Sequence, residues 1–327
     1  MKKTDEKLKI GVIGIGHMGS NHVRVLENEK HFFDLVGIYD TNEERAKMIA
    51  EEFETVAYNT LDDLLDNVEA VVIAVPSSLH KEVAIHVAER GKHALVEKPI
   101  APTSSEAKEI VEMFSSRNLK LAVGHIERFN PTFQELKKIV NKDNVFYVEA
   151  HRYSPFTGSG RITDVSVVED LMIHDVDLVL DVVNALNIVS ISSSGESIKS
   201  NKADFATAMI KFDKNVHAII NASRVSQHKE RSIVIHLEDS VVEADLLTRT
   251  LKINKNTNIT LTGTNENFYT QDGILQRVFV PGTEPLREEL VAFYNALKNG
   301  APIEVDGEIG LRAVLVCEQI VKKIMEN

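Results

Sequence analysis

Short apolar runs alternate with segments of helical spacing through the first part of the chain. The runs are too short for helices and rich in β-branched residues, which is typical of strands buried on both faces of a parallel sheet. Because helical segments separate the runs, the pattern predicts a doubly wound parallel sheet with right-handed crossovers. The expected strands are residues 8–13, 35–39, 70–75, 93–96 and 120–123, with helices at 43–53 and 79–90.

The pattern changes after about residue 124, where longer stretches alternate apolar and polar residues, as residues 206–212 do. Such alternation is typical of antiparallel strands with one face in water. A chain of 327 residues is also long enough for two domains. We therefore predict an α/β protein, with a doubly wound domain over residues 1–124 and an α/β domain with an open, mostly antiparallel sheet over residues 125–327. The expected strands of the second domain are residues 145–152, 188–194, 203–212, 216–223 and 232–238. We expect helices at 167–185 and 286–298 to cover one face of their sheet. A last helix at 308–325 is expected to pack on the first domain.

Composition and charge exclude several classes of protein. Hydrophobic residues make up 43% and charged residues 26%, as in ordinary globular proteins. A net charge of −12 repels phosphate backbones, so we expect no nucleic acid partner. The longest apolar run, residues 70–76, is far shorter than the ~20 residues of a membrane-spanning helix, so we expect no membrane partner. A charged N-terminus and one cysteine, Cys317, are typical of a cytoplasmic protein without disulfides.

The first candidate site lies between the first expected strand and the helix after it. Residues 14–19, Gly-Ile-Gly-His-Met-Gly, fit the pattern G-x-G-x-x-G. The first glycine allows a tight turn, the second lets the backbone approach a pyrophosphate, and the third lets helix and strand pack closely. The alternative is a glycine turn without a ligand. The residues expected to contact a dinucleotide here are Gly14, Gly16, His17, Met18 and Gly19.

An acidic residue follows this motif at the spacing typical of dinucleotide-binding domains. Asp40 ends the second expected strand, where a carboxylate accepts hydrogen bonds from the adenosine ribose. It also repels a 2′-phosphate, and Thr41 and Asn42 follow it instead of an arginine. The sequence therefore predicts NAD as the cofactor, with Asp40 and Thr41 in its site.

A lysine stands at the carboxyl end of another expected strand, in Glu97-Lys98-Pro99. Doubly wound folds bind their ligands at this edge of the sheet. A lysine whose pKa is lowered by its neighbours can donate or accept the proton of a reacting hydroxyl. The alternative is a solvated surface lysine near a strand end.

Asp170 and His174 are four residues apart in a stretch of helical spacing, so their side chains share one face. Histidine titrates near neutral pH, and a carboxylate one turn away can orient it. One alternative is a structural helix start, with Asp170 as a first-turn acid and His174 buried. A metal site is a second alternative, but no paired histidines or cysteines complete it, and we expect no metal.

Two loops carry further candidate residues. Residues 124–131 connect the two domains and include Arg128 and Asn130, which are placed to contact cofactor or substrate. Arg152 and Arg161 flank a loop rich in glycine and serine, and paired guanidinium groups bind anions well. The alternatives are a plain connection between domains and a strand connection with solvated arginines.

These motifs together resemble the Gfo/Idh/MocA oxidoreductases over nearly the whole chain. The resemblance implies a Rossmann domain, a tightly held nicotinamide cofactor, and positions beside the reacting carbon for Lys98, Asp170 and His174. Within this family, residues 124–131, and residues 154–156 together with 170–175, are most similar to the UDP-N-acetylglucosamine 3-dehydrogenases. The cofactor-binding residues then also include Val75, Pro76, Leu79, His80, Glu97, Lys98 and Arg128.

The resemblance implies NAD-dependent oxidation of a sugar hydroxyl, with C3 of a UDP-linked N-acetylhexosamine as the expected site. Whether Lys98 or His174 is the base stays open. One alternative is an inositol or simple-sugar dehydrogenase. Another is a non-catalytic NAD-binding regulator, although such a protein has no need of both side chains. An open sheet needs covering, so a homodimer or homotetramer is expected. The substrate-binding residues are then Lys98, Asn130, Arg152, Arg161, Asp170 and His174.

Overall fold

The computed structural model divides the chain into two compact units. The first unit consists of Met1–Phe129 and Glu284–Leu315, and the second of Asn130–Thr283 and Val316–Asn327. The first unit thus runs a few residues past the expected boundary and includes a segment from near the C-terminus. The structure describes residues 6–156, 165–183, 187–261 and 269–326.

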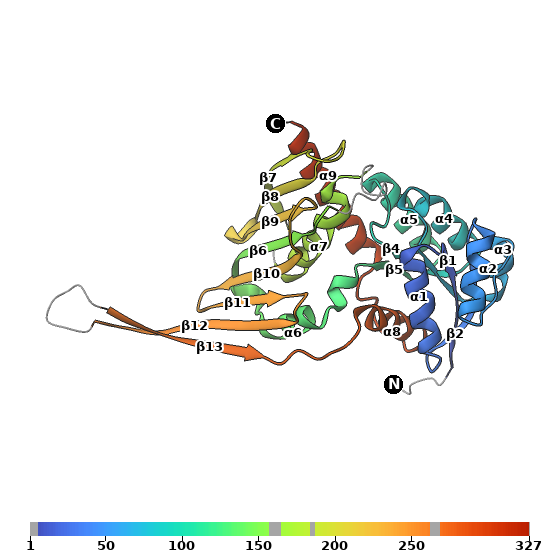
Figure 1. Cartoon of the computed structure of the whole chain (residues 1–327), viewed down its shortest axis with the longest axis horizontal. Helices are drawn as coiled ribbons and strands as arrows, with labels where there is room; N and C mark the ends of the chain where they lie inside the picture. The colour runs from blue at the N-terminus through green and yellow to red at the C-terminus, as the bar shows by residue number, and fades with distance from the viewer. Residues whose placement is uncertain (1–5, 157–164, 184–186, 262–268, 327) are drawn as a thin grey trace. The chain divides into compact units, whose positions relative to one another are not determined.

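The described part of the first unit contains a five-stranded parallel sheet with the order β2-β1-β3-β4-β5 (Figure 1). This confirms the doubly wound sheet expected from the apolar runs. The strand order reverses between β1 and β3, and ligands of such sheets bind where the order reverses, outside the carboxyl ends of the strands. The strands are β1 (Leu8–Ile13), β2 (Phe33–Tyr39), β3 (Ala70–Ile73), β4 (His93–Glu97) and β5 (Leu121–Gly124).

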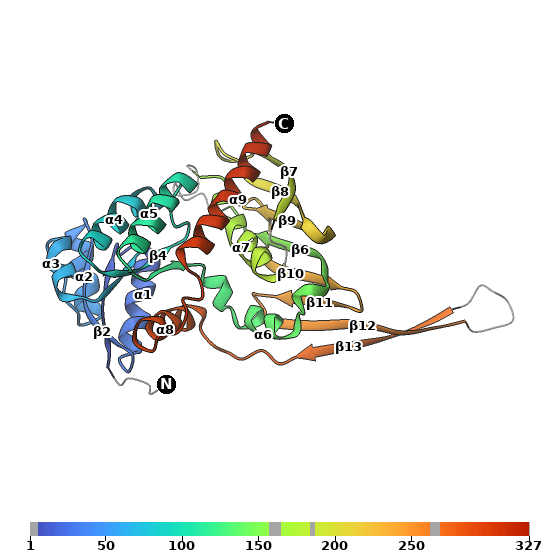
Figure 2. The ribbon, with the colours of Figure 1, turned by 180° about the vertical axis from the view of Figure 1, so that it is seen from behind.

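Helices cover both faces of this sheet, with α1 beside α8 on one face and α4 beside α5 on the other (Figures 1 and 2). Several of them begin at a side-chain cap, such as Thr103, whose hydroxyl accepts a hydrogen bond from the Glu106 amide. The helical segments are α1 (His17–Asn28), α2 (Glu43–Glu52), α3 (Leu61–Asn67), η1 (Ser77–Leu79), α4 (His80–Glu89), α5 (Ser104–Ser116), η2 (Ile126–Phe129) and α8 (Pro285–Lys298).

Helix α8 corrects one sequence prediction. It was expected to cover the second sheet, but it packs in the first unit, where Leu290 and Phe293 join the core that includes Leu26. Tyr294 adds an edge contact with the ring of Phe33. The sequence shows that one face of this helix is apolar, but the same apolar face fits any complementary surface. The choice between the two sheets is therefore made by tertiary packing.

The described part of the second unit contains an eight-stranded sheet with the order β13-β12-β11-β10-β6-β9-β8-β7 (Figure 1). All neighbours are antiparallel except β6 and β9. This confirms a mostly antiparallel sheet, although the last three strands were not predicted. The strands are β6 (Val145–Tyr153), β7 (Ile188–Glu196), β8 (Phe205–Phe212), β9 (His217–Ser223), β10 (Glu230–Leu237), β11 (Ser240–Asp245), β12 (Thr250–Leu261) and β13 (Tyr269–Val278).

One face of this sheet is covered by helices, and the other is open among the described residues. Strand β8 alternates strictly, and Ala208 and Ile210 on its covered face are fully buried while Met209 on the other is 48% exposed. Helices α7 and α9 lie on the covered face (Figure 2), where the Ser193 hydroxyl donates to the Ile320 carbonyl at 2.8 Å. The alternation therefore arises because one face of the strand is buried under helices and the other is exposed, as the sequence predicted.

The helical segments of the second unit include one that differs from expectation. The stretch predicted as one helix at 167–185 begins with a π-helical turn, Val168–Met172, and continues as α7 (Ile173–Val182); residues 184–186 lie outside the described residues. The chain turns from β8 to β9 through η6 (Asp213–Asn215). The other segments are α6 (Pro131–Ile139), η3 (Lys142–Asn144) and α9 (Gly307–Met325), which begins in the first unit.

Two further sequence predictions concern the whole chain. Cys317 is buried on α9, with Sγ 3.9 Å from the Val168 carbonyl oxygen. In the part of the chain that the structure describes, no helix combines the length and the apolar composition that crossing a membrane requires.

Candidate active site

The glycine motif forms the turn between β1 and α1. Gly14 has a φ of +87°, and a Cβ atom there would lie 2.7 Å from the Val75 amide nitrogen. A Cβ atom on Gly19 would lie 1.9 Å from the Gly14 carbonyl oxygen, whereas one on Gly16 would meet nothing within 4 Å. The first and third glycines therefore permit close packing, and the second leaves its side of the backbone open. This arrangement fits the approach of a pyrophosphate.

The start of helix α1 is also suited to an anion. Gly16 is its N-cap, no side chain caps it, and its first turn has no acidic residue. The first amide groups of the helix and the positive end of its dipole are thus directed at the same open side of the turn. His17 is exposed and Met18 partly exposed at this end. The residues present therefore fit a dinucleotide.

Asp40 is tied to this turn from the end of β2. Its carboxylate accepts hydrogen bonds from the amides of Ile15 at 2.6 Å and Asn42 at 2.8 Å, and from Arg45 at 2.9 Å. Burial by itself raises the pKa of Asp40, but these hydrogen bonds and the Arg45 charge outweigh it and hold the pKa below its ordinary value. Asp40 is therefore ionised at neutral pH. Sequence reasoning missed Arg45, which follows Asp40 by five residues rather than directly.

His80 lies behind the carboxyl edge of the sheet. Its side chain is buried, with Nδ1 2.8 Å from the Pro99 carbonyl oxygen and Nε2 3.0 Å from that of Val75. The ring therefore joins the two loops that follow β3 and β4. This corrects its expected role as a direct cofactor contact, because the ring nitrogens face the protein backbone. Val75 is partly exposed, and Pro76, Leu79 and Thr41 are exposed.

Glu97 also belongs to the interior. Its Oε1 lies 2.7 Å from His22 Nε2 on α1, and its Oε2 accepts a bond from the Lys98 amide at 3.3 Å. Burial raises the pKa of Glu97, but the hydrogen bond and charge of His22 together with the charge and amide of Lys98 outweigh it, and the pKa lies below its ordinary value. Glu97 is therefore a support for Lys98 and for α1, which corrects its expected contact with cofactor. Lys98 itself is partly exposed at the end of the strand.

A second buried carboxyl group lies in the same unit. Glu289 on α8 is 3% exposed, and neither of its oxygens has a hydrogen-bond partner among the described residues. It lines a cavity of about 10 Å³, room for one water molecule. Burial, and then the charge of Glu97, raise the pKa of Glu289 well above its ordinary value. This side chain was not singled out in the sequence, because α8 was assigned to the other domain.

The connection between the units holds two predicted residues that are both buried. Asn130 caps α6: its Oδ1 accepts the Thr132 amide at 3.0 Å, and its Nδ2 donates to the Leu246 carbonyl at 3.2 Å. Both polar atoms of the Asn130 side chain therefore have structural partners, so the expected contact with substrate is not needed to explain this residue. Arg128, in η2, is only 5% exposed.

The second unit carries Asp170 in the π-helical turn and His174 at the start of α7, and both side chains are partly exposed. The backbone turns into this segment at Ser166, whose amide donates to Glu169 Oε2 at 2.9 Å. A π turn contains more residues than an α turn and is often found at functional sites. The structure thus places the acid and the histidine in consecutive turns, the first of which has a geometry that the sequence did not predict.

Arg152 does not have the environment of a substrate ligand. It is 2% exposed, and its Nε and Nη2 donate to the two carboxylate oxygens of Asp175 at 2.8 and 2.9 Å. This bidentate pair corrects the expectation that Arg152 binds a diphosphate directly. Its predicted companion Arg161 lies outside the described residues. Among the residues that the structure does describe, no group of three or more histidine, cysteine, aspartate and glutamate side chains is placed to hold a metal ion.

Two family models cover most of the chain. Residues 8–125 match an oxidoreductase family with an NAD-binding Rossmann fold, and residues 134–243 match the GFO/IDH/MocA C-terminal domain. The chain belongs to the GFO/IDH/MocA oxidoreductase family. Family membership confirms the resemblance seen in the motifs, and it makes the chain an NAD-binding oxidoreductase.

Individual members of the GFO/IDH/MocA family are similar over most of their length. UDP-N-acetylglucosamine 3-dehydrogenase of Acidithiobacillus ferrooxidans is 33% identical over 314 residues, 96% of either chain. A solved structure of that protein matches with a TM-score of 0.89 at 32% identity and covers 98% of both chains. The scyllo-inositol 2-dehydrogenase (NAD(+)) of Bacillus subtilis is 26% identical over 257 residues, 72% of this chain and 74% of its own.

A more distant solved structure shares the fold alone. Levoglucosan dehydrogenase, in complex with NADH and levoglucosan, matches with a TM-score of 0.83 at 18% identity and covers 98% of both chains.

Proposed function

We propose that this GFO/IDH/MocA protein oxidises C3 of a UDP-linked N-acetylhexosamine to a 3-keto sugar. The observation that carries the proposal is the 33% identity, over 96% of both chains, with a UDP-N-acetylglucosamine 3-dehydrogenase. The partly exposed Lys98, Asp170 and His174 supply the acid–base groups that such a reaction needs.

NAD supplies a hydride acceptor when it is bound. The open side of Gly16 and the uncapped start of α1 hold its pyrophosphate, and Asp40 holds the adenosine ribose. His174 takes the proton of the reacting hydroxyl, and Asp170 orients the imidazole. Lys98 donates a hydrogen bond to the hydroxyl oxygen and stabilises the negative charge that develops on it.

An assay with a substrate panel tests this function. UDP-N-acetylglucosamine, UDP-glucose, free N-acetylglucosamine and myo-inositol are each incubated with NAD and an NADH-consuming acceptor, because oxidation of a secondary alcohol is unfavourable near neutral pH. The product is reduced with borodeuteride, and NMR locates the deuterium. Deuterium at C3 of the UDP-sugar supports the proposal. Turnover of inositol alone favours the second candidate, an inositol dehydrogenase, to which the 26% identity with the scyllo-inositol enzyme points.

We also propose that the protein forms a homodimer or homotetramer through the open face of the eight-stranded sheet. Large apolar side chains project from this face, including Phe205 at 37% and Met209 at 48% exposure. Scattered exposed side chains are ordinary, but a contiguous apolar face is usually covered. Light scattering of the wild type and of Met209→Glu tests this. A monomeric wild type contradicts the proposal, whereas a dimer that Met209→Glu dissociates supports it.

A further inference from the structure

Two buried arginine–aspartate pairs lie at the two ends of the segment that carries the candidate acid–base residues. Arg224 and Asp204 hold the chain before the π-helical turn, and Arg152 and Asp175 hold the chain after it. All four side chains are almost completely buried, at 0–2% exposure. Buried ion pairs are costly unless their hydrogen bonds are well satisfied, so both pairs call for an explanation.

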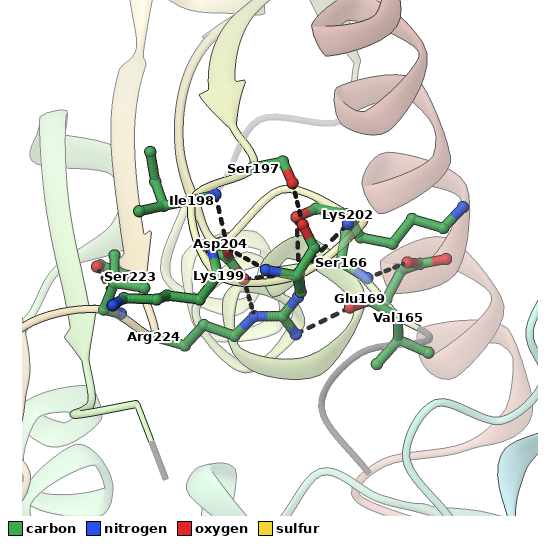
Figure 3. A network of polar contacts seen from close by, with 12 residues as sticks. Val165, Ser166, Glu169, Ser197, Ile198, Lys199, Lys202, Asp204, Ser223 and Arg224 are labelled. Carbon is green, nitrogen blue, oxygen red and sulfur yellow. Dashed lines mark hydrogen bonds and ion pairs between the residues drawn. The ribbon is translucent and has the colours of Figure 1, made fainter. Parts of the chain in front are cut away.

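The first pair is the centre of a dense network shown in Figure 3. Asp204 Oδ2 accepts hydrogen bonds from the amides of Ile198 at 2.7 Å and Ser200 at 3.0 Å, and also from that of Lys199. Its Oδ1 accepts from Arg224 Nε at 2.8 Å. Burial raises the pKa of Asp204, but these donors outweigh it and hold the pKa far below its ordinary value. Asp204 therefore carries a charge in the interior that Arg224 compensates.

The same arginine reaches the chain that leads into the π turn. Arg224 Nη1 donates to the Val165 carbonyl at 2.8 Å, as Figure 3 also shows. Two residues further on, the Val167 amide donates to the Ala203 carbonyl at 2.8 Å. The backbone that leads into Val168–Met172 is thus hydrogen-bonded to the residues just before β8 and just after β9. The position of the π turn is therefore set by hydrogen bonds to residues that flank the sheet strands and not by bonds within the helix alone.

The second pair holds the other end. Arg152 is on β6, which lies inside the sheet between β10 and β9. Its guanidinium forms a two-pronged contact with Asp175, with Nε and Nη2 at 2.8 and 2.9 Å from the two carboxylate oxygens. Asp175 directly follows His174 in the first turn of α7. A bidentate pair fixes orientation as well as distance, so it restrains the rotation of this first turn.

The turn between the two pairs is one that needs support. A π turn has less favourable geometry than an α turn, and such backbone persists only where the surroundings hold it. Relaxation to an α-helix would shift the register by one residue, a rotation of roughly 100° about the helix axis. Asp170 lies inside the π turn and His174 just after it, so this relaxation would change the orientation of the two side chains relative to each other and to the sheet.

We propose that Arg152 and Arg224 are positioning residues for the reaction. Through Asp175 and the Val165 carbonyl they hold both ends of the π turn and fix the orientation of Asp170 and His174, and neither arginine touches the substrate. The inference rests on the proposed function of Asp170 and His174. It assigns to Arg152 a role in orienting the acid–base pair in place of the diphosphate contact that the sequence suggested.

The test uses the full-length variants Arg152→Lys and Arg224→Lys, which keep the charge and remove the planar fork. Steady-state kinetics, NAD affinity and hydrogen exchange of residues 165–182 are measured. We expect kcat to fall about 10- to 100-fold in each arginine variant, a loss typical of a catalytic group that has been displaced. KM and NAD affinity stay within about threefold of the wild type, and residues 165–182 exchange faster. Asp175→Asn, which has the same shape, replaces Arg152→Lys if that variant does not fold.

Ser193→Ala is the matched control, because it also removes a buried hydrogen bond to a helix on the same face of the sheet. It should lower thermal stability and leave kcat unchanged. The proposal is overturned if the arginine variants exchange faster but keep kcat, or if Ser193→Ala loses kcat as they do. A wild type inactive on every sugar overturns the proposed function instead. In that case hydrogen exchange alone tests whether the two arginines hold the π turn in place. Unchanged exchange of residues 165–182 in the variants would show that they do not.

Discussion

The Nη2 atom of Arg45 lies 2.9 and 3.1 Å from the two carboxylate oxygens of Asp40. Asp40 is buried, whereas the Arg45 side chain is 44% exposed at the same edge of the sheet. The carboxylate that we propose selects NAD thus has beside it a guanidinium suited to a 2′-phosphate. We therefore expect cofactor selectivity to depend on both residues.

Asp40→Ser should weaken NAD binding and narrow its advantage over NADP. The lost hydrogen bonds to ribose are each worth about 1–3 kcal/mol, and Arg45 becomes available to a 2′-phosphate. Calorimetric titration with both cofactors measures the change. The double variant Asp40→Ser/Arg45→Ala should lose NAD affinity but should show no relative gain in NADP affinity, because Arg45 is absent. A wild type that prefers NADP would refute the selectivity argument.

Lys98→Ala should lower kcat by about 100-fold or more, the usual cost of removing a donor that stabilises charge developing in the transition state. NAD affinity and the melting temperature should remain close to those of the wild type, because Lys98 lies at the edge of the sheet and is partly exposed. Lys108→Ala, at a position 67% exposed on α5, is the matched control. Near-normal turnover in Lys98→Ala would indicate that Lys98 is a solvated surface residue with no role in the reaction.

Glu289→Gln should stabilise the protein at neutral and alkaline pH. The pKa of Glu289 is raised in the folded state, so the folded protein binds more protons than the unfolded chain as pH rises above about 4.5. Wild-type stability therefore falls with rising pH from there up to the folded pKa. Glutamine cannot ionise, so the gain in melting temperature should grow from pH 4 to pH 8. Glu308→Gln, at an exposed position, is the control. A gain independent of pH would exclude ionisation as its cause.

Arg161→Ala should weaken the binding of UDP, whereas Arg152→Lys should not. The prediction follows from the sequence position of Arg161 and from the buried pairing of Arg152 with Asp175. Charge-assisted contacts with a diphosphate also weaken as salt screens them. Calorimetry at low and high salt measures both effects. Equal loss of UDP affinity in the two variants would indicate that Arg152 contacts the substrate, as the sequence predicted.

The sequence predicted the first domain closely because its signals are local. The apolar runs of the five parallel strands and the glycine motif act within a few residues, and β1 spans the predicted residues 8–13. Family membership confirms the resemblance on which the predictions for Lys98 and His174 rest. The three strands β11–β13 were not predicted because half or more of the residues in each are not apolar, so their sequences carry a weak hydrophobic pattern.

The roles of single polar side chains were less predictable. Asn130, Glu97 and Arg152 have residue types that bind ligands, but each is buried and hydrogen-bonded within the protein. Their partners Leu246, His22 and Asp175 are far away in the sequence, so no local pattern indicates the pairing.

By itself the sequence determined the two-domain α/β organisation, the family and the NAD-binding turn, because hydrophobic periodicity and glycine conformation are properties of neighbouring residues. Only the tertiary structure decided which unit buries α8, which carboxylate meets Arg152, and that Val168–Met172 forms a π turn. These features depend on contacts between distant segments, whose geometry and burial set the energy of each polar group.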